Sequence, residues 1–212
     1  MFKQKFFFIV FEGIEGTGKS FQIKKLLSNL KKKNINALKT REPGGSHTGE
    51  KIRNLIFSKI GKSFHKLTDY YLMLASRNEH LKKTILKAKK KNLLVISDRF
   101  TDSTYAYQVV GNNINEKLNY INHKYILDGV KPDLTIILKS NFDSISKRLK
   151  KRKNKNKYDE LKYKFYSKVQ NGYIKKAKKN MSKYRIFDST LNNNNLEKKI
   201  IKLILEKIKY DR

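Results

Sequence analysis

The sequence predicts an α/β fold in which a five-stranded parallel sheet is covered by helices on both faces. Apolar runs of strand length alternate with helical patterns along the 212 residues of the chain. This alternation is typical of parallel sheets, because the crossover between two parallel strands usually runs through a helix. A glycine-rich turn joins the first strand to the first helix, and charged residues directly follow later strands. In such folds ligands bind beyond the carboxyl ends of the strands.

The five expected strands are short apolar runs, which suit strands buried on both faces. They cover residues 6–11, 35–40, 93–97, 134–138 and 184–187. The helices between them carry one apolar stripe, with lysines on the opposite side. The stripe is formed by Ile23, Leu26, Leu27 and Leu30 in the first helix and by Leu196, Ile200, Leu203, Ile204 and Ile208 in the last. A chain of this length is expected to form a single domain over residues 1–212.

The charge balance is strongly basic, with 50 lysines and arginines against 18 acidic residues and a formal net charge of +32. Such a charge is typical of proteins that bind nucleic acid. However, the lysines are scattered through every helical segment. We therefore interpret them as solvated helix faces, with weak and salt-sensitive affinity for polyanions and no specific nucleic-acid partner.

Other classes of protein are disfavoured by composition. Cysteine is absent, which excludes a disulfide framework and thiol chemistry and fits a cytoplasmic protein. No apolar run approaches the length of a membrane span. The run at 6–11 is too short for the core of a signal peptide and leads directly into the glycine-rich turn. The four histidines have neither metal-ligand spacing nor triad partners, and we assign them no role.

The glycine-rich turn has the pattern G-x-x-x-x-G-K-S of a phosphate-binding loop. Its residues are Gly13, Ile14, Glu15, Gly16, Thr17, Gly18, Lys19 and Ser20. Small residues let backbone amides close around a polyphosphate, and the following helix adds its positive N-terminus. Lys19 can then reach the β and γ phosphates of ATP, while the Ser20 hydroxyl can ligate Mg²⁺. The flanking strand and helix supply the context that this motif requires, which predicts a three-layer P-loop NTPase fold.

A second group of charged residues lies after two other expected strands. The segment Thr40–Gly45 contains Arg41, and Asp98 and Arg99 follow the third strand. An acidic residue in the place of Asp98 orients Mg²⁺ or its water shell in P-loop enzymes. Two arginines can hold a second phosphate through paired hydrogen bonds. If they are not simply surface ion pairs, they predict phosphoryl transfer between two nucleotides, because an ATPase needs one polyphosphate site.

Three motifs together resemble the thymidylate kinase (dTMP kinase) family, of the bacterial type with a basic lid. Residues 96–108 match its pattern D-R-[aromatic]-x-x-S-x-x-A-[aromatic]-Q, residues 40–45 match T-R-E-P-G-G, and residues 132–135 match P-D-L-T. The resemblance spans nearly the whole chain. It implies transfer of the ATP γ-phosphoryl group to dTMP, with Mg²⁺ carried on ATP, in a homodimer.

The resemblance also implies roles for individual residues. Arg41 and Arg99 would bind the dTMP phosphate, and Glu15 would accept from the sugar 3′-hydroxyl and help to order the metal and water. Arg77 would donate to thymine O4, with Thr104 and Gln108 at the base edge. Tyr107 would pack against C2′ of the sugar. A steric block there is needed, because an apolar pocket alone discriminates poorly between closely related substrates.

The chain departs from the family pattern at several positions. Met73 stands where the family has a phenylalanine that stacks on thymine; four residues before Arg77, it shares a helix face with that arginine. The lid, expected at about 148–160, has Asn156-Lys157-Tyr158-Asp159 in place of D-R-x-E. Lys139 replaces an acid after the fourth strand.

Gly16 is a further informative position, because some members of the family have an arginine there that supplies charge to the transition state. With glycine, the charge must come from the basic lid. Candidates for this role are Arg148, Arg152, Lys155 and Lys157. The expected catalytic residues are therefore Lys19, Glu15, Arg99, Arg148 and Arg152.

Three alternative functions remain open from the residues. The chain could be a monophosphate kinase for another pyrimidine nucleotide, such as UMP, CMP or dUMP. It could be a P-loop ATPase stimulated by nucleic acid, as its charge would suit. It could also be a nucleotide-binding relic with little activity, given Met73 and the altered lid.

Overall fold

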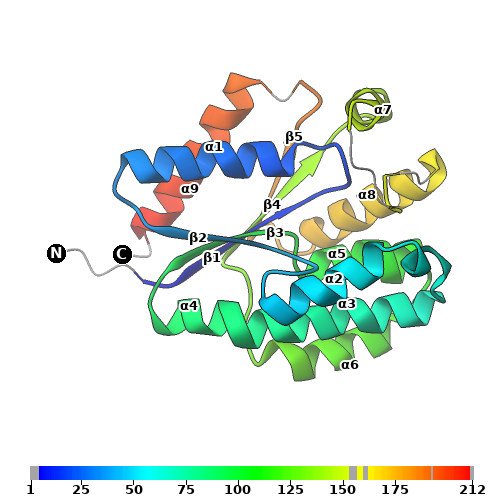
Figure 1. The fold of residues 1–212 in the computed structure, drawn as a ribbon. Helices are drawn as coiled ribbons and strands as arrows, with labels where there is room; N and C mark the ends of the chain where they lie inside the picture. The colour runs from blue at the N-terminus through cyan, green and yellow to red at the C-terminus, as the bar shows by residue number, and fades with distance from the viewer. Residues whose placement is uncertain (1–4, 153–156, 160–161, 192, 211–212) are drawn as a thin grey trace.

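A computed structural model describes residues 5–152, 157–159, 162–191 and 193–210. Five parallel strands form one sheet in the order β2-β3-β1-β4-β5 (Figure 1). The strands are β1 (Phe7–Glu12), β2 (Ala37–Arg41), β3 (Leu94–Asp98), β4 (Leu134–Lys139) and β5 (Tyr184–Asp188). The strand prediction is confirmed, with ends that differ by no more than two residues.

Helices cover both faces of this sheet. In Figure 1, α1 (Lys19–Lys32) and α9 (Asn194–Tyr210) lie on one face, and the segments from α2 to α6 lie on the other. These segments are α2 (His47–Phe57), η1 (Ile60–Ser63), α3 (Lys66–His80), η2 (Leu81–Ile85), α4 (Leu86–Lys90), α5 (Thr101–Thr104), η3 (Tyr105–Gly111) and α6 (Glu116–Leu127). After β4 come α7 (Phe142–Lys150) and α8 (Tyr163–Lys178). Within the described residues, no helix is long and apolar enough to span a bilayer.

The side chains of β1 alternate between two apolar cores. Phe7, Ile9 and Phe11 pack with α1 and α9 on one face, while Phe8 and Val10 pack with η2 and α4 on the other. This alternation follows from the two-residue repeat of a strand, and both sets are buried because helices cover both faces. The expected apolar stripes of α1 and α9 lie in the first of these cores. The three-layer fold is therefore confirmed.

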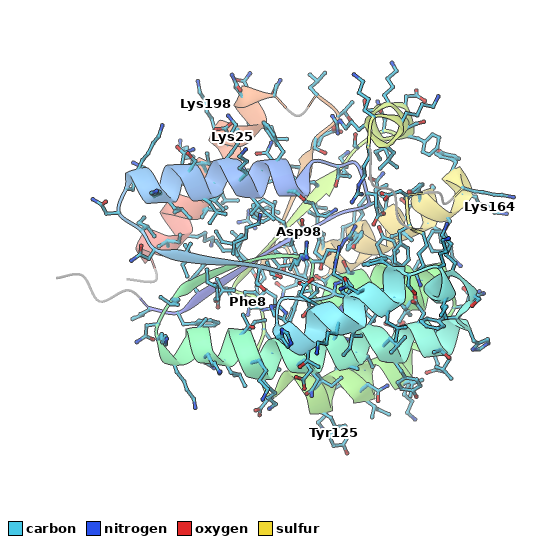
Figure 2. All side chains as sticks on the ribbon, viewed as in Figure 1. Phe8, Lys25, Asp98, Tyr125, Lys164 and Lys198 are labelled. Atoms are coloured by element: carbon cyan, nitrogen blue, oxygen red, sulfur yellow. The ribbon has the colours of Figure 1, made fainter. Side chains whose placement is uncertain are left out.

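The carboxyl ends of the central strands bring the charged residues of the sequence together. Arg41 of β2 pairs in register with Asp98 of β3, and Phe11 of β1 pairs with Asp98 from the other side. Asp98 lies in the middle of the molecule, between the helix layers (Figure 2). The phosphate-binding loop follows β1 at the same edge of the sheet. The fold thus places both groups of charged residues around one site.

The excess lysines lie on widely separated parts of the molecule. In Figure 2, Lys25 of α1 and Lys198 of α9 lie on one side and Lys164 of α8 on another, all at the periphery. Lys25 also forms an ion pair of 3.3 Å with Glu197. These three lysines are carried by three different helices.

Candidate active site

The loop after β1 has the backbone of a phosphate cradle. Gly13 has a φ of 137°, and a Cβ at this position would lie 2.3 Å from the Leu138 carbonyl oxygen. Glycine is therefore required where the loop crosses β4. The Lys19 amine donates to the carbonyl oxygens of Gly13 at 2.7 Å and Ile14 at 3.0 Å. Thr17 also donates to the Ile14 carbonyl oxygen, so the loop is closed by its own side chains.

Lys19 is buried, and its charge depends on the surrounding residues. Burial lowers its pKa to about 8, and the positive charge of Arg99 adds to this effect, while Asp98, Glu15 and Glu12 oppose it. A bound triphosphate would favour the protonated amine through its negative charge. The site therefore holds a cation that is suited to an anionic ligand.

Next to Lys19, the Ser20 hydroxyl donates to the Asp98 carboxylate over 2.9 Å. These two oxygens are hard ligands of the kind that Mg²⁺ takes, and Mg²⁺ needs few protein ligands when phosphate and water complete its shell. Among the described residues there is no cluster of three or more acidic, histidine or cysteine side chains that could hold a metal. The pair thus fits a Mg²⁺ ion whose remaining ligands are nucleotide phosphates and water.

Arg99 is held by several partners behind the loop. Its guanidinium donates to Glu15 at 2.7 Å, Ser103 at 3.1 Å and Tyr173 at 2.9 Å. Burial opposes its charge, but neighbouring carboxylates, Glu15 and Asp98 among them, outweigh burial and raise the pKa of Arg99 well above its ordinary value. Arg99 is therefore a fixed and permanent cation.

Glu15 joins the loop to the expected sugar pocket. One carboxylate oxygen accepts from Arg99, and the other accepts a short hydrogen bond from the Tyr107 hydroxyl. Burial raises the pKa of Tyr107 well above its usual value, so this phenol is neutral and donates. The arrangement fixes the Tyr107 ring beside Arg99, 5.1 Å from its guanidinium carbon.

One cavity of about 540 Å³ brings nearly all the predicted site residues together. It is lined by Glu15, Gly16, Gly18, Lys19, Ser20, Arg41, Met73, Arg77, Asp98, Arg99, Thr104, Tyr107, Gln108, Arg148 and Arg152. The remaining loop residues, Gly13, Ile14 and Thr17, lie behind it and bind Lys19 or one another. Arg41 and Arg99 thus line the same cavity as Lys19.

Arg41 and Arg99 are held differently, although their sequence contexts are similar. Arg41 forms a double hydrogen bond with Glu50, at 2.7 and 3.2 Å, and its side chain is 53% exposed at the rim of the cavity. The Arg99 side chain is 15% exposed. Arg41 can therefore move toward a ligand, whereas Arg99 is fixed before one binds.

Arg77 is buried and lines the cavity, and every guanidinium nitrogen has an acceptor. Its partners are Glu42, Thr104, His123 and the Phe100 carbonyl oxygen, at 2.6 to 2.8 Å. Glu42 also binds His80. Although burial opposes it, Arg77 and His80 lower the pKa of Glu42. A base that takes a hydrogen bond from Arg77 must share or replace one of these acceptors.

His123 holds Arg77 as a neutral side chain, a role that the sequence did not reveal. Its Nδ1 lies 2.8 Å from the Asn119 carbonyl oxygen, which can only accept, so Nδ1 carries the proton and Nε2 accepts from Arg77. Burial lowers the pKa of His123 to about 4, and the charge of Arg77 adds to this effect.

The depressed pKa of His123 predicts a loss of stability in acid. The contribution of neutral His123 to the free energy of unfolding is complete above about pH 6.5, the pKa of histidine in the unfolded chain. This contribution falls as the pH drops toward about 4, the pKa of His123 in the folded protein. Between pH 7 and 5 this loss is about 2 kcal/mol. Glutamine does not titrate, so this loss should be absent in His123→Gln. Its free energy of unfolding, measured by urea denaturation, should fall by about 2 kcal/mol less between pH 7 and 5 than that of the wild type. A pH dependence of the free energy of unfolding in His123→Gln equal to that of the wild type would contradict the assignment.

The π-helical segment η3 arranges the expected base and sugar pocket. Thr104 directly precedes it, Tyr107 and Gln108 lie within it, and all three line the cavity with Met73 of α3. A π-helix has a wider turn than an α-helix and is frequent at functional sites. Gln108 donates weakly to the Tyr158 hydroxyl, at 3.5 Å.

The basic residues of the expected lid have separate positions. Arg148 donates to the carbonyl oxygens of Gly16, Ser189 and Thr190, at 2.6 to 3.0 Å, and so holds α7 against the phosphate loop. Arg152 pairs with Asp159 at 2.6 Å. Residues 153–156 and 160, which include Lys155 and Asn156, lie outside the described residues.

Two lysines singled out in the sequence lie away from the cavity lining. Lys157 binds Asp69 at 2.5 Å and the Gly61 carbonyl oxygen at 3.1 Å. Lys139 pairs at 3.6 Å with Asp188 across the β4–β5 edge.

Arg53 is a cavity residue that is not among those predicted from the sequence. It lines the cavity beside Arg41, donates to the Pro43 carbonyl oxygen at 2.8 Å and lies over the Phe57 ring at 4.7 Å. Burial and then Arg41 lower its pKa to about 10. One sequence signal could have indicated Arg53. It lies three residues after Glu50, so the two share one face of α2, and Glu50 is the partner of Arg41.

Comparisons with known proteins agree with this geometry. The family model of thymidylate kinase matches residues 11–200. Thymidylate kinase of Mycoplasma capricolum is 38% identical over 95% of this chain and 96% of its own, and that of Mesoplasma florum is 37% identical over the same shares. The crystal structure of thymidylate kinase from Ehrlichia chaffeensis superposes with a TM-score of 0.76 at 31% identity, covering 95% of this chain and 99% of that one. The chain therefore belongs to the thymidylate kinase family.

Proposed function

We propose that this protein is a single-domain kinase that transfers the γ-phosphoryl group of ATP to dTMP, giving ADP and dTDP for dTTP synthesis. The observation that carries this assignment is the shared cavity, which Lys19, Arg41 and Arg99 all line. A donor phosphate and an acceptor phosphate can then meet within one cavity. Their proximity converts a reaction between two solutes into a step within one complex.

The chemistry requires positioning and charge rather than a strong base. The attacking oxygen of a monophosphate is already anionic, so proton removal is not needed. Lys19 neutralises charge on the β and γ phosphates, and Arg148 is fixed by three carbonyl oxygens on the donor side. Arg152 can add charge if it exchanges Asp159 for a phosphate. These groups would stabilise the transferring phosphoryl group without a large rearrangement.

Magnesium would be held by the Ser20 hydroxyl and, through water, by Asp98, which lie 2.9 Å apart. When bound, it offsets the negative charge of the nucleotide phosphates. Glu15 lines the same cavity, where it can order water and accept from the sugar 3′-hydroxyl.

The other residues that line the cavity would bind the acceptor, dTMP. Arg41 and Arg99 would hold its phosphate, and Arg77, Thr104 and Gln108 would face the base. Met73 supplies a flexible apolar contact in place of an aromatic ring. The wall also includes Arg53, which can reinforce the phosphate subsite from α2.

Tyr107 is expected to exclude ribose from the sugar pocket. In Tyr107→Ala, the ratio of kcat/KM for dTMP over the ribonucleotide UMP should fall by about 10-fold or more, because the ring no longer blocks a 2′-hydroxyl. Tyr107→Phe keeps the ring and should keep most of the selectivity. Steady-state kinetics with both acceptors provide the measurement. Selectivity unchanged in the alanine variant would remove Tyr107 from the sugar pocket.

Release of ADP with different acceptors tests the function directly. ADP should form rapidly with dTMP, slowly with UMP, CMP or dUMP, and at background level with ATP alone. Stimulation by DNA or RNA in the absence of a monophosphate would instead support the ATPase alternative. Absence of turnover with every acceptor, at unchanged ATP binding, would support a relic.

Three broader features are part of this proposal. Residues at about 148–160 would act as the lid over ATP.

A homodimer would bury apolar side chains of α3 and α6. On α6, Tyr120 is 68% and Tyr125 82% exposed, and Tyr125 points away from the molecule in Figure 2. Sedimentation of the purified protein measures this assembly. A cytoplasmic location would suit an enzyme that consumes ATP.

A further inference from the structure

Tyr173 lies behind the acceptor site without lining the cavity. It is on α8, its side chain is fully buried, and its ring packs edge-on against Tyr107 at 6.3 Å. Its hydroxyl lies 2.9 Å from Nη1 of Arg99 and 2.8 Å from Oγ of Ser103. A single buried hydroxyl therefore joins α8 to the arginine that faces the cavity.

The directions of these hydrogen bonds follow from the chemistry of the groups. A guanidinium can only donate, so the Tyr173 oxygen accepts from Arg99. The Ser103 hydroxyl donates to the Glu12 carboxylate at 2.7 Å, and its oxygen, which also accepts from Arg99 at 3.1 Å, has a second lone pair for the Tyr173 proton. The result is one ordered chain of donors and acceptors from Arg99 through Tyr173 and Ser103 to Glu12. Burial raises the pKa of Tyr173 well above its usual value, so the phenol keeps the proton that this chain needs.

The backbone at Arg99 also needs this support. Arg99 has a φ of 76°, in the left-handed region that residues with a Cβ adopt only at a cost. Its amide donates to the Phe11 carbonyl oxygen at 2.9 Å, and the next amide, of Phe100, donates to Glu12 at 2.8 Å. Glu12 thus holds the turn, while Tyr173 holds the guanidinium that projects from it.

We propose that Tyr173 is a positioning residue of the acceptor site, which fixes the Arg99 guanidinium toward the phosphate of the monophosphate without touching the substrate. This inference rests on the proposed function, in which Arg99 binds that phosphate. Ser103 and Glu12 are the outer members of the same chain. A guanidinium fixed in advance loses less freedom when the phosphate binds, which increases affinity.

Replacement of Tyr173 with phenylalanine tests the inference. The dissociation constant of dTMP, measured by calorimetry on the full-length protein, should rise about 10-fold, while that of ATP stays within about 2-fold. Tyr70→Phe is the matched control, because it removes the hydroxyl of another fully buried tyrosine, bonded to Asn122 outside the cavity lining. Both values should be unchanged in that variant. Ser103→Ala should weaken dTMP binding in the same direction.

A double-mutant cycle separates positioning from direct contact. In an Arg99→Lys background, Tyr173→Phe should have little further effect on dTMP affinity, because the fork that it orients is gone. An additive effect would overturn the inference, as would unchanged dTMP affinity in Tyr173→Phe. A lowered melting temperature with normal dTMP affinity would show a structural role and also overturn it. If wild-type protein neither binds nor phosphorylates dTMP, the proposed function itself fails, which is a different outcome.

Discussion

Replacing Lys19 with alanine is expected to lower kcat by about 10²-fold or more. The amine is buried at the cavity, 2.7 Å from the Gly13 carbonyl oxygen, and needs little reorganisation to reach a phosphate. A charge that is already in place in a site with little water stabilises a transition state far more than an exposed one. Removing one such donor typically costs a factor of about 10² to 10³. Steady-state kinetics with dTMP and saturating ATP measure the effect.

Lys24 provides the matched control for this experiment. It lies on the exposed side of the same helix, α1, five residues after Lys19. Lys24→Ala removes an equal formal charge far from any phosphate, so kcat should stay within about 2-fold of wild type. Melting temperatures of both variants show whether the loop is intact, since Lys19 also binds two loop carbonyl oxygens. Near-normal turnover of a folded Lys19→Ala protein would contradict the role assigned to the loop.

Much of the fold was predictable because its signals are local. Apolar runs such as 93–97 are consecutive in the sequence, and the loop at Gly13–Ser20 requires its residues at fixed spacing. The rule that ligands bind at strand ends then placed Arg41 and Asp98 at one edge of the sheet. The register of β2 and β3 confirms that placement.

The supporting contacts could not be predicted because they join segments that are distant in the sequence. Tyr173 meets Arg99 only because α8 packs against η3, and His123 meets Arg77 only because α6 packs against α3. A lone tyrosine or histidine within a helical pattern carries no signal of such a contact. Lys157 illustrates the converse, since its basic context suggested a role toward ATP, whereas Asp69 of α3 holds it.

The relative importance of Arg41 and Arg99 for dTMP binding could not be predicted from the sequence. Their difference in burial predicts that Arg99 is the more important of the two. We expect Arg99→Lys to raise the KM for dTMP by about 10²-fold or more, because lysine keeps the charge but cannot reproduce the fork that binds Glu15, Ser103 and Tyr173. Each hydrogen bond between the guanidinium and the dTMP phosphate, which is charged, contributes about 1.5 to 3 kcal/mol to binding. The loss of two such bonds accounts for a factor of about 10². Arg41→Lys, at the exposed rim, should raise the KM by about 10-fold at most, since solvent screens its charge. The KM for ATP should change little in either variant. An Arg41→Lys effect equal to or larger than that of Arg99→Lys would show that the phosphate lies toward α2, and that the buried arginine serves the fold rather than the acceptor.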